Sequence, residues 1–90
     1  MKPNRPPVDF KSLPEDVRFI ITSAAASYGL KPHDILSTSA KKIVSMARQD
    51  AIMAVRNLGI YSYPEIGRFF SRSHPSCIYA VQKANVRLAA

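Results

Sequence analysis

Several features of membrane-spanning and disulfide-stabilised proteins are missing from this sequence. It has no tryptophan and one cysteine, Cys77, which excludes an internal disulfide framework and leaves that side chain a small packing role. No apolar run approaches the roughly 18 residues that cross a bilayer. The N-terminus is basic but, unlike a signal peptide, has no apolar stretch before Pro14. We therefore expect a cytoplasmic protein without membrane contact.

Motifs for catalysis, metal binding and cofactor binding are also missing. Glycine occurs only at positions 29, 59 and 67, so the G-x-x-x-x-G-K-[ST] loop that cradles nucleotide phosphates cannot form. His33 and His74 are far apart, and no pair of His or Cys residues has the spacing of a zinc site. Cys77 is expected inside a packed helix with no base beside it. We expect no enzyme activity, no metal, no nucleotide and no cofactor.

The chain does have a large and uneven positive charge. Its formal net charge is +7, from 13 basic and 6 acidic side chains. Residues 1–40 contain five basic and four acidic residues, whereas residues 41–90 contain eight and two. A positive surface attracts polyanions, because neutralised phosphates release condensed counterions. Nucleic acid is the favoured partner; a basic surface that serves solubility alone and an anionic membrane are the alternatives.

Proline separates an N-terminal arm from the remainder of the chain. Four of the seven prolines lie in residues 1–14, and each removes a backbone donor and restricts the residue before it. We interpret residues 1–13 as a flexible, proline-rich basic arm. Ninety residues supply one modest hydrophobic core, so residues 14–90 are interpreted as a single domain.

Helical periodicity dominates that domain, and no useful alternation of strand type occurs, which predicts an all-α fold. Ser12 and Glu15 have capping-box spacing and predict a first helix that starts near Pro14 and ends at Gly29. A single helical turn is expected within residues 30–36. The apolar stripe of the first helix consists of Val17, Ile20, Ile21, Ala24, Ala25 and Tyr28.

A long central helix is expected from Ser39 to Gly59. Its predicted apolar face consists of Ile43, Ala47, Ala51, Ala54, Val55 and Leu58. A second capping box at residues 62–65 opens a short helix, and a tight turn at residues 71–73 leads to a last helix capped by Ser73 or His74. The predicted inward residues of these two helices are Ile66, Phe69, Phe70, Ile78, Val81 and Leu88. Together they form a helix-turn-helix over residues 63–84.

In a helix-turn-helix, the N-terminal turn of the second helix enters the major groove of DNA. Residues 72–76, Arg-Ser-His-Pro-Ser, supply the expected basic and small polar side chains at that position. Arg72 offers a planar fork for phosphate or guanine, and the serines and His74 can bond base edges or phosphate. The alternative, in which Ser73 only caps the helix and Arg72 is a solvated turn residue, stays open at this point.

Several different short motifs follow one another along residues 28–83. They are Tyr28-Gly-Leu, Asp34-Ile-Leu-Ser, Ile43-Val, Ala47-Arg-Gln49, Tyr63-Pro-Glu-Ile-Gly-Arg-Phe-Phe70, Arg72-Ser-His-Pro-Ser76 and Ala80-Val-Gln-Lys83. In this stretch the chain resembles the C-terminal DNA-binding domain of the bacterial chromosomal replication initiator DnaA, which recognises DnaA boxes. The resemblance implies a compact, Trp-repressor-like helical bundle with a long central helix.

The resemblance also implies roles for individual residues. Arg48 and Arg56 would contact phosphates, whereas Tyr63 and Pro64 would approach the backbone and a thymine methyl. The family places a minor-groove arginine at what looks like Ala40, and Lys41 and Lys42 would supply charge beside it. In the family, the turn that corresponds to residues 72–76 usually has the sequence Arg-Asp-His-Thr-Thr. The base preference of this chain would therefore differ from that of the family. The DNA-binding residues implied are Lys41, Lys42, Arg48, Arg56, Tyr63, Pro64, Arg72, Ser73, His74, Pro75 and Ser76.

We interpret the chain as a sequence-specific, double-stranded DNA-binding protein without ATPase activity. It would be a nucleoid-associated monomer, such as one encoded by a phage or mobile element. It would regulate, or compete at, replication-origin or promoter sites. The alternative is a protein-interaction adaptor that binds a replication protein through the same fold.

Overall fold

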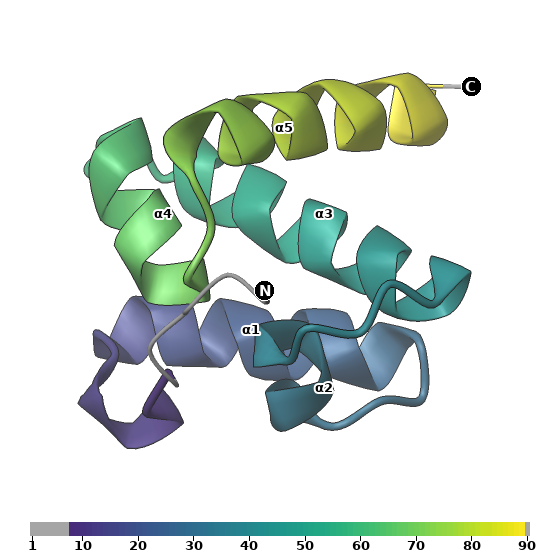
Figure 1. The fold of residues 1–90 in the computed structure, drawn as a ribbon, viewed down its shortest axis with the longest axis horizontal. Helices are drawn as coiled ribbons and strands as arrows, with labels where there is room; N and C mark the ends of the chain where they lie inside the picture. The colour runs from purple at the N-terminus through teal and green to yellow at the C-terminus, as the bar shows by residue number, and fades with distance from the viewer. Residues whose placement is uncertain (1–7, 90) are drawn as a thin grey trace, which may run out of the picture.

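The structure is a computed structural model that describes residues 8–89. Within that range it consists of helices only, which confirms the all-α prediction (Figure 1). A 3-10 turn, η1 (Phe10–Ser12), precedes five α-helices. They are α1 (Glu15–Ser27), α2 (Pro32–Leu36), α3 (Lys42–Asn57), α4 (Tyr63–Phe70) and α5 (His74–Ala89).

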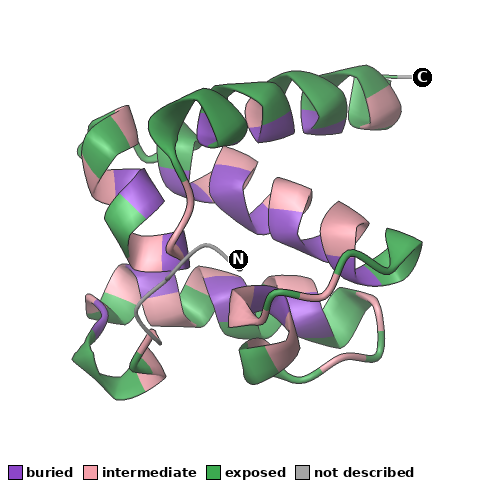
Figure 2. Cartoon of the chain, viewed as in Figure 1, coloured by how far each residue is buried: buried purple, intermediate pink, exposed green. Residues whose placement is uncertain are grey.

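Helix α3 is the centre of the bundle. It lies between α1 on one side and α5 on the other, while α4 packs against the first half of α5 (Figure 1). Buried residues lie on the faces that α1, α3 and α5 turn toward one another (Figure 2). The long central helix is thus confirmed, and it holds the first helix and the helix-turn-helix in one core. That core contains Leu13, Val17, Ile21, Ala25, Ile35, Ala47, Ala51, Ile52, Val55, Ile66, Phe70, Cys77 and Ala80.

The segment before α1 differs from the flexible arm expected from the prolines. Residues 1–7 of that arm lie outside the described residues, but Phe10–Ser12 forms the 3-10 turn and Leu13 is buried in the core. The hydroxyl of Ser12 donates to the carbonyl of Asp9 at 2.8 Å, so Ser12 does not cap α1. Pro14 is the N-cap instead. The apolar side chains of this segment fold it back onto the domain despite its prolines.

The end of α1 follows the sequence pattern. Gly29 has φ +68°, the left-handed conformation in which glycine carries no Cβ penalty. The amide of Leu30 then donates to the carbonyl of Ala25 at 2.8 Å and closes the helix terminus. Val17, Ile21 and Ala25 are fully buried, as the predicted stripe requires.

The buried face of α3 agrees with the predicted face in part. Ala47, Ala51 and Val55, expected inside, are buried, whereas Ile43 and Leu58 are exposed. Val44 and Ile52 are buried as well, and so is Arg48. Because a charged residue in the middle of the buried stripe interrupts its hydrophobic pattern, the prediction placed one edge of the face on Ile43 instead of Val44.

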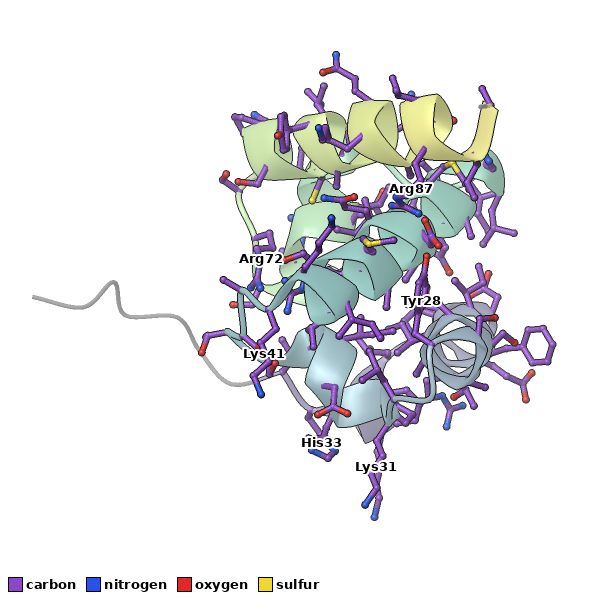
Figure 3. The ribbon with its side chains drawn as sticks, turned by 90° about the vertical axis from the view of Figure 1, so that its right-hand side faces the viewer. Tyr28, Lys31, His33, Lys41, Arg72 and Arg87 are labelled. Atoms are coloured by element: carbon purple, nitrogen blue, oxygen red, sulfur yellow. The ribbon has the colours of Figure 1, made fainter. Side chains whose placement is uncertain are left out.

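A polar cluster joins the far end of α5 to the rest of the bundle. The guanidinium of Arg87 pairs with Asp50 of α3 at 2.7 Å and donates to the hydroxyl of Tyr28 at 3.2 Å (Figure 3). Tyr28 also donates to Asp50, and this hydrogen bond is the main reason that the pKa of Tyr28 lies above its ordinary value. These groups are 22 to 59 residues apart in sequence, and the cluster was not predicted.

Candidate nucleic-acid interface

Helix α4 begins with the capping box that the sequence predicts. The hydroxyl of Ser62 accepts from the amide of Glu65 at 3.3 Å, and the carboxylate of Glu65 accepts from the amide of Ser62 at 2.9 Å. The amide of Ser62, and secondly its hydroxyl at 3.0 Å, donate to the Glu65 carboxylate and hold the pKa of Glu65 below its ordinary value. The cap fixes the first turn of α4, which presents Pro64 to solvent and leaves Tyr63 half-buried.

The turn between α4 and α5 packs directly on Gly67. Ser71 ends α4 in the left-handed conformation, with φ 53° and ψ 48°. The amide of Arg72 then donates to the carbonyl of Gly67 at 2.8 Å. A Cβ added to Gly67 would lie 2.5 Å from the carbonyl oxygen of Arg72. Glycine at position 67 therefore lets the backbone of the turn approach α4 closely.

The start of α5 exposes a short polar run. Ser73, His74, Pro75 and Ser76 are all exposed. The hydroxyl of Ser73 accepts from the amide of Ser76 at 3.3 Å, so Ser73 caps the helix while remaining on the surface. The capping alternative for Ser73 is therefore observed, and it leaves the side chain open to solvent. We call residues 72–76 the reading turn.

The inward face behind the reading turn is made by small residues. Cys77, Ala80 and Ala84 are buried, and burial raises the pKa of the Cys77 thiol. This agrees with the packing role expected for Cys77. Ile78 and Leu88, which were expected inside, are 38% and 56% exposed, because small side chains let α5 lie close to α3 on a different face.

Arg72 connects the reading turn to a segment far away in the sequence. Its guanidinium donates from Nη2 to the carbonyl of Ser37 at 3.0 Å and from Nη1 to the carbonyl of Ser71 at 3.4 Å. Ser37 belongs to residues 37–41, which join α2 to α3 and which we call the anchor loop. Lys41, at the end of this loop, lies on the same side of the molecule as Arg72 (Figure 3). The fold thus brings the reading turn and the end of the anchor loop, two regions in which the sequence predicts DNA contacts, to the same side of the molecule.

Arg48, to which the resemblance gives a phosphate contact, is buried in the fold. Only 8% of it is exposed. Its Nε donates to the carbonyl of Ile35 at 2.8 Å, and its Nη2 donates to the carbonyls of Ser37 and Ser39, both at 3.0 Å. Helix α2 and the anchor loop thus supply acceptors for its charge.

The remaining predicted cations lie at the two ends of α3. Lys41 and Lys42 are exposed at its N-terminus, where helix amides and the helix dipole also favour anions. Arg56 is exposed in the last turn, where its guanidinium lies 4.4 Å from the ring centroid of Tyr63 and donates to the carbonyl of Tyr61 at 3.3 Å. Arg56 and Tyr63 therefore form one corner of the surface, and the two lysines form another.

Among residues 8–89, no group of His, Cys, Asp or Glu is arranged to hold a metal ion. In the same part of the chain, no helix is long and apolar enough to cross a membrane.

Comparison with known proteins identifies similar sequences. The family model described as bacterial dnaA protein helix-turn-helix matches residues 17–84. The chromosomal replication initiator protein DnaA of Thermus thermophilus is 40% identical over 74 residues, which are 81% of this chain and 17% of the relative. The same protein of Pseudothermotoga lettingae is 37% identical over 73 residues, 81% of this chain and 16% of the relative.

The initiator of Deinococcus radiodurans is 36% identical over 64 residues, which cover 71% of this chain and 14% of that protein. The chain therefore spans about a sixth of the length of the curated relatives it matches. No solved structure gives a significant match.

Proposed function

This chain belongs to the family of bacterial DnaA helix-turn-helix domains, and from that premise we propose that it binds double-stranded DNA and reads its sequence. The observation that carries the proposal is the reading turn, whose residues 73–76 are all exposed at the first turn of α5. This is the position from which a recognition helix contacts base edges in the major groove. Its backbone is held by the contact with Gly67, so it can present a defined set of groups.

Cations are placed to hold such a helix on the DNA backbone. Lys42 and Arg56 are 14 residues apart on α3, which is about 21 Å at the rise of an α-helix. The major groove is about 12 Å wide. Contacts from the two ends of α3 can therefore reach phosphates on both sides of a groove that contains the reading turn. Lys41, Lys42 and Arg56 would supply affinity and orientation, and the reading turn would supply discrimination.

The base preference is expected to differ from that implied by the resemblance. Ser73 replaces the usual aspartate and so removes an acceptor for a cytosine amino group, while Pro75 and Ser76 replace two threonines. Ser76 retains a hydroxyl but no methyl for a thymine contact. The positive reading turn and the lysines favour DNA of any sequence, and the altered side chains select among sites.

We further propose a place of action at the nucleoid. The relatives are replication initiators by name and are about six times longer than the matched region. The matched region would occupy replication-origin or promoter sites without ATPase activity of its own, as a regulator or a competitor of an initiator. We propose a monomer, which light scattering coupled to size exclusion can check.

Selection from a randomised duplex library tests the central proposal. We expect recovery of one enriched motif, with the bound fraction falling as salt rises, because each phosphate contact adds about 0.9 to the slope of log K against log salt. Anisotropy titrations with the enriched duplex and a scrambled duplex then give the discrimination. Equal affinity for both duplexes, or loss of all binding at moderate salt with no enriched motif, would contradict sequence reading.

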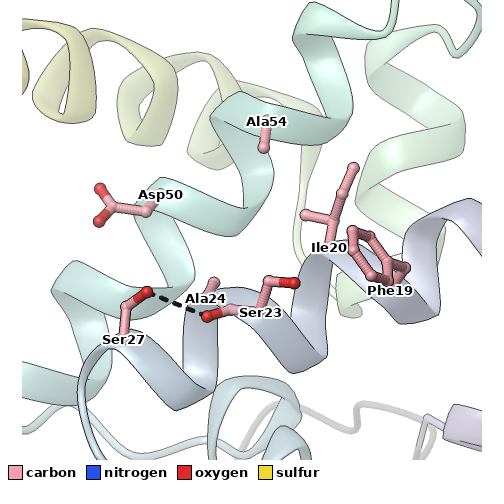
Figure 4. A pocket seen from close by; sticks show the side chains of 7 residues that line it. All are labelled: Phe19, Ile20, Ser23, Ala24, Ser27, Asp50 and Ala54. Carbon is pink, nitrogen blue, oxygen red and sulfur yellow. Dashed lines mark hydrogen bonds between the residues drawn. The ribbon is translucent and has the colours of Figure 1, made fainter.

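A second candidate function is contact with a replication protein. Phe19 is 73% exposed on α1 and lines two hollows, of about 530 and 240 Å³. Figure 4 shows the side chains that line the second of them. Glu15 and Asp16 line the first hollow, and Asp50 lines the second. Two of the six acidic residues of a basic chain thus line the first hollow beside Phe19, whereas Asp50 in the second hollow is already paired with Arg87. We propose that the occupant is an apolar side chain flanked by lysine or arginine on a replication protein.

Binding of purified Thermus thermophilus initiator, measured by surface plasmon resonance, tests this second candidate. Phe19→Ser is expected to reduce binding at least roughly tenfold, because it removes the apolar anchor. Val86→Ser is the matched control, since Val86 is 72% exposed but lies on α5, away from both hollows. Absence of binding by the unmodified chain, or equal losses in the two variants, would contradict the proposal.

A further inference from the structure

Two arginines from distant parts of the chain donate to a single backbone carbonyl. The carbonyl of Ser37 accepts from Nη2 of Arg48 and from Nη2 of Arg72, each at 3.0 Å. Arg48 is 11 residues from Ser37 in sequence, and Arg72 is 35 residues away. One comes from the middle of α3 and the other from the reading turn. The anchor loop is thus fastened on one side to the core and on the other side to the site that faces DNA.

Arg48 satisfies acceptors that the local backbone cannot satisfy. Helix α2 has only five residues, and the last carbonyls of any helix lack intrahelical donors. Arg48 supplies donors to the carbonyls of Ile35, Ser37 and Ser39, which follow one another through the end of α2 and into the anchor loop. A guanidinium is planar, permanently charged and equipped with five donors, so it can hold three carbonyls at once. The buried charge therefore sets the path of the chain from Ile35 to Ser39.

That path decides where the exposed cations lie. The anchor loop ends at Lys41, the N-cap of α3, and Lys42 follows as the first residue of the helix. On the other side of the loop, the Ser37 carbonyl holds the guanidinium of Arg72 within the reading turn. Movement of residues 37–39 would displace Lys41 and the Arg72 side chain together. A single buried side chain is thus connected to both a phosphate-contacting region and a base-reading region.

We propose that Arg48 is a positioning residue for DNA binding: by fixing the anchor loop, it holds Lys41 and Arg72 on one surface without itself contacting phosphate. This inference rests on the proposed DNA-binding function and deepens it. It assigns Arg48 a role different from that of Arg56, which lies on the same helix but is exposed. The two arginines of α3 are therefore expected to respond differently to the same substitutions.

The substitution Arg48→Lys tests the positioning role of this side chain separately from its charge. Arg48→Lys retains the positive charge, but a single ammonium on a flexible stem cannot hold three carbonyls in the same plane. Binding is measured with one duplex at several salt concentrations, below the unfolding temperature of every variant. Removing both lysines in Lys41→Ala/Lys42→Ala is expected to lower the salt slope by about 1.8, the sum of two phosphate contacts.

If Arg48 positions the lysines, the effect of Arg48→Lys on the salt slope depends on whether Lys41 and Lys42 are present. Arg48→Lys alone is expected to lower the salt slope toward that of the double-lysine variant, and to leave the slope unchanged when Lys41 and Lys42 are already alanine. A direct phosphate contact predicts a different pattern, in which Arg48→Lys has no effect on the slope in either background. Arg56→Lys is the matched control and is expected to retain the slope in both backgrounds. An unchanged slope for Arg48→Lys in the parent chain would overturn the proposal.

Amide hydrogen exchange in the free protein tests the positioning role of Arg48 without DNA. The amides of Ser39 and Lys41 donate to the hydroxyls of Ser37 and Ser39, at 3.2 and 3.3 Å. Arg48→Lys is expected to accelerate exchange in residues 37–41 at least roughly tenfold, whereas Arg56→Lys is not. Unchanged exchange in the anchor loop would overturn the positioning role even if DNA binding is confirmed. Faster exchange in a chain that binds no duplex would instead refute the proposed function alone. Arg48→Gln is the second variant if the lysine variant does not fold.

Discussion

Replacing Gly67 by alanine is expected to destabilise the domain by roughly 2 kcal/mol, as overpacked sites do, and to weaken DNA binding more than tenfold. The added Cβ would lie 2.5 Å from the carbonyl oxygen of Arg72, which belongs to the backbone of the turn and cannot rotate away. Alanine improves helix propensity by about 1 kcal/mol over glycine, so a net loss would show that the clash is the larger effect. Urea unfolding measures the stability, and titration with the selected duplex measures the binding.

Gly59→Ala is the matched control for this substitution. Gly59 has φ +74° and nothing within 4 Å of the position that a Cβ would occupy. Alanine there is expected to lose about 1 kcal/mol through the left-handed backbone alone. It should leave binding at low temperature unchanged, because the reading turn is not displaced. If Gly67→Ala were as stable as the parent chain and bound the duplex normally, the close packing of the turn on α4 would be refuted.

The local elements of the helix-turn-helix could be predicted from sequence because their signals are local. Ser62 and Glu65 are three residues apart and form the predicted capping box. Gly29 ends α1 with the expected positive φ. The reading turn was identified from its order of charged and small polar residues, and residues 73–76 are exposed as that interpretation requires. In each case, a few neighbouring residues are sufficient to specify the local structure.

The roles of the arginines could not be read in the same way. Whether an arginine is a surface cation or a buried donor depends on which carbonyls the fold brings to it. The acceptors of Arg48 lie 9 to 13 residues earlier, and the Ser37 acceptor of Arg72 lies 35 residues earlier. Hydrophobic periodicity treats Arg48 as an interruption, which moved the predicted face of α3 onto Ile43. The same burial turned an expected phosphate contact into a candidate positioning residue.

In the N-terminal segment, the proline content was a poor guide to packing. The prolines predicted a flexible arm over residues 1–13, but they say nothing about the apolar side chains of residues 8–13. Leu13 is 8% exposed, and Val8 and Phe10 pack against the core. The composition therefore missed the contribution of residues 8–13 to the core.

The second large effect concerns discrimination between duplexes, which we expect to depend on the reading turn, whereas general affinity depends on the cations of α3. His74→Ala is expected to remove roughly 1 to 3 kcal/mol of discrimination between the selected duplex and one altered at a single base pair, which is about a 5- to 150-fold change. Arg72→Ala is expected to act in the same direction. Arg56→Ala should instead weaken every duplex by a similar factor and lower the salt slope by about 0.9.

The comparison between His74 and Arg56 is the more decisive one, because base reading is proposed for the first side chain and phosphate contact for the second. Both are exposed cationic or polar side chains on α-helices of the same domain, and neither belongs to the buried core. If the first turn of α5 lies in the major groove, only His74 lies close enough to distinguish base pairs. If the domain binds DNA through charge alone, both substitutions weaken matched and altered duplexes alike. Titrations of the selected, altered and scrambled duplexes with the two variants therefore determine whether this helix-turn-helix reads sequence or only contacts the DNA backbone.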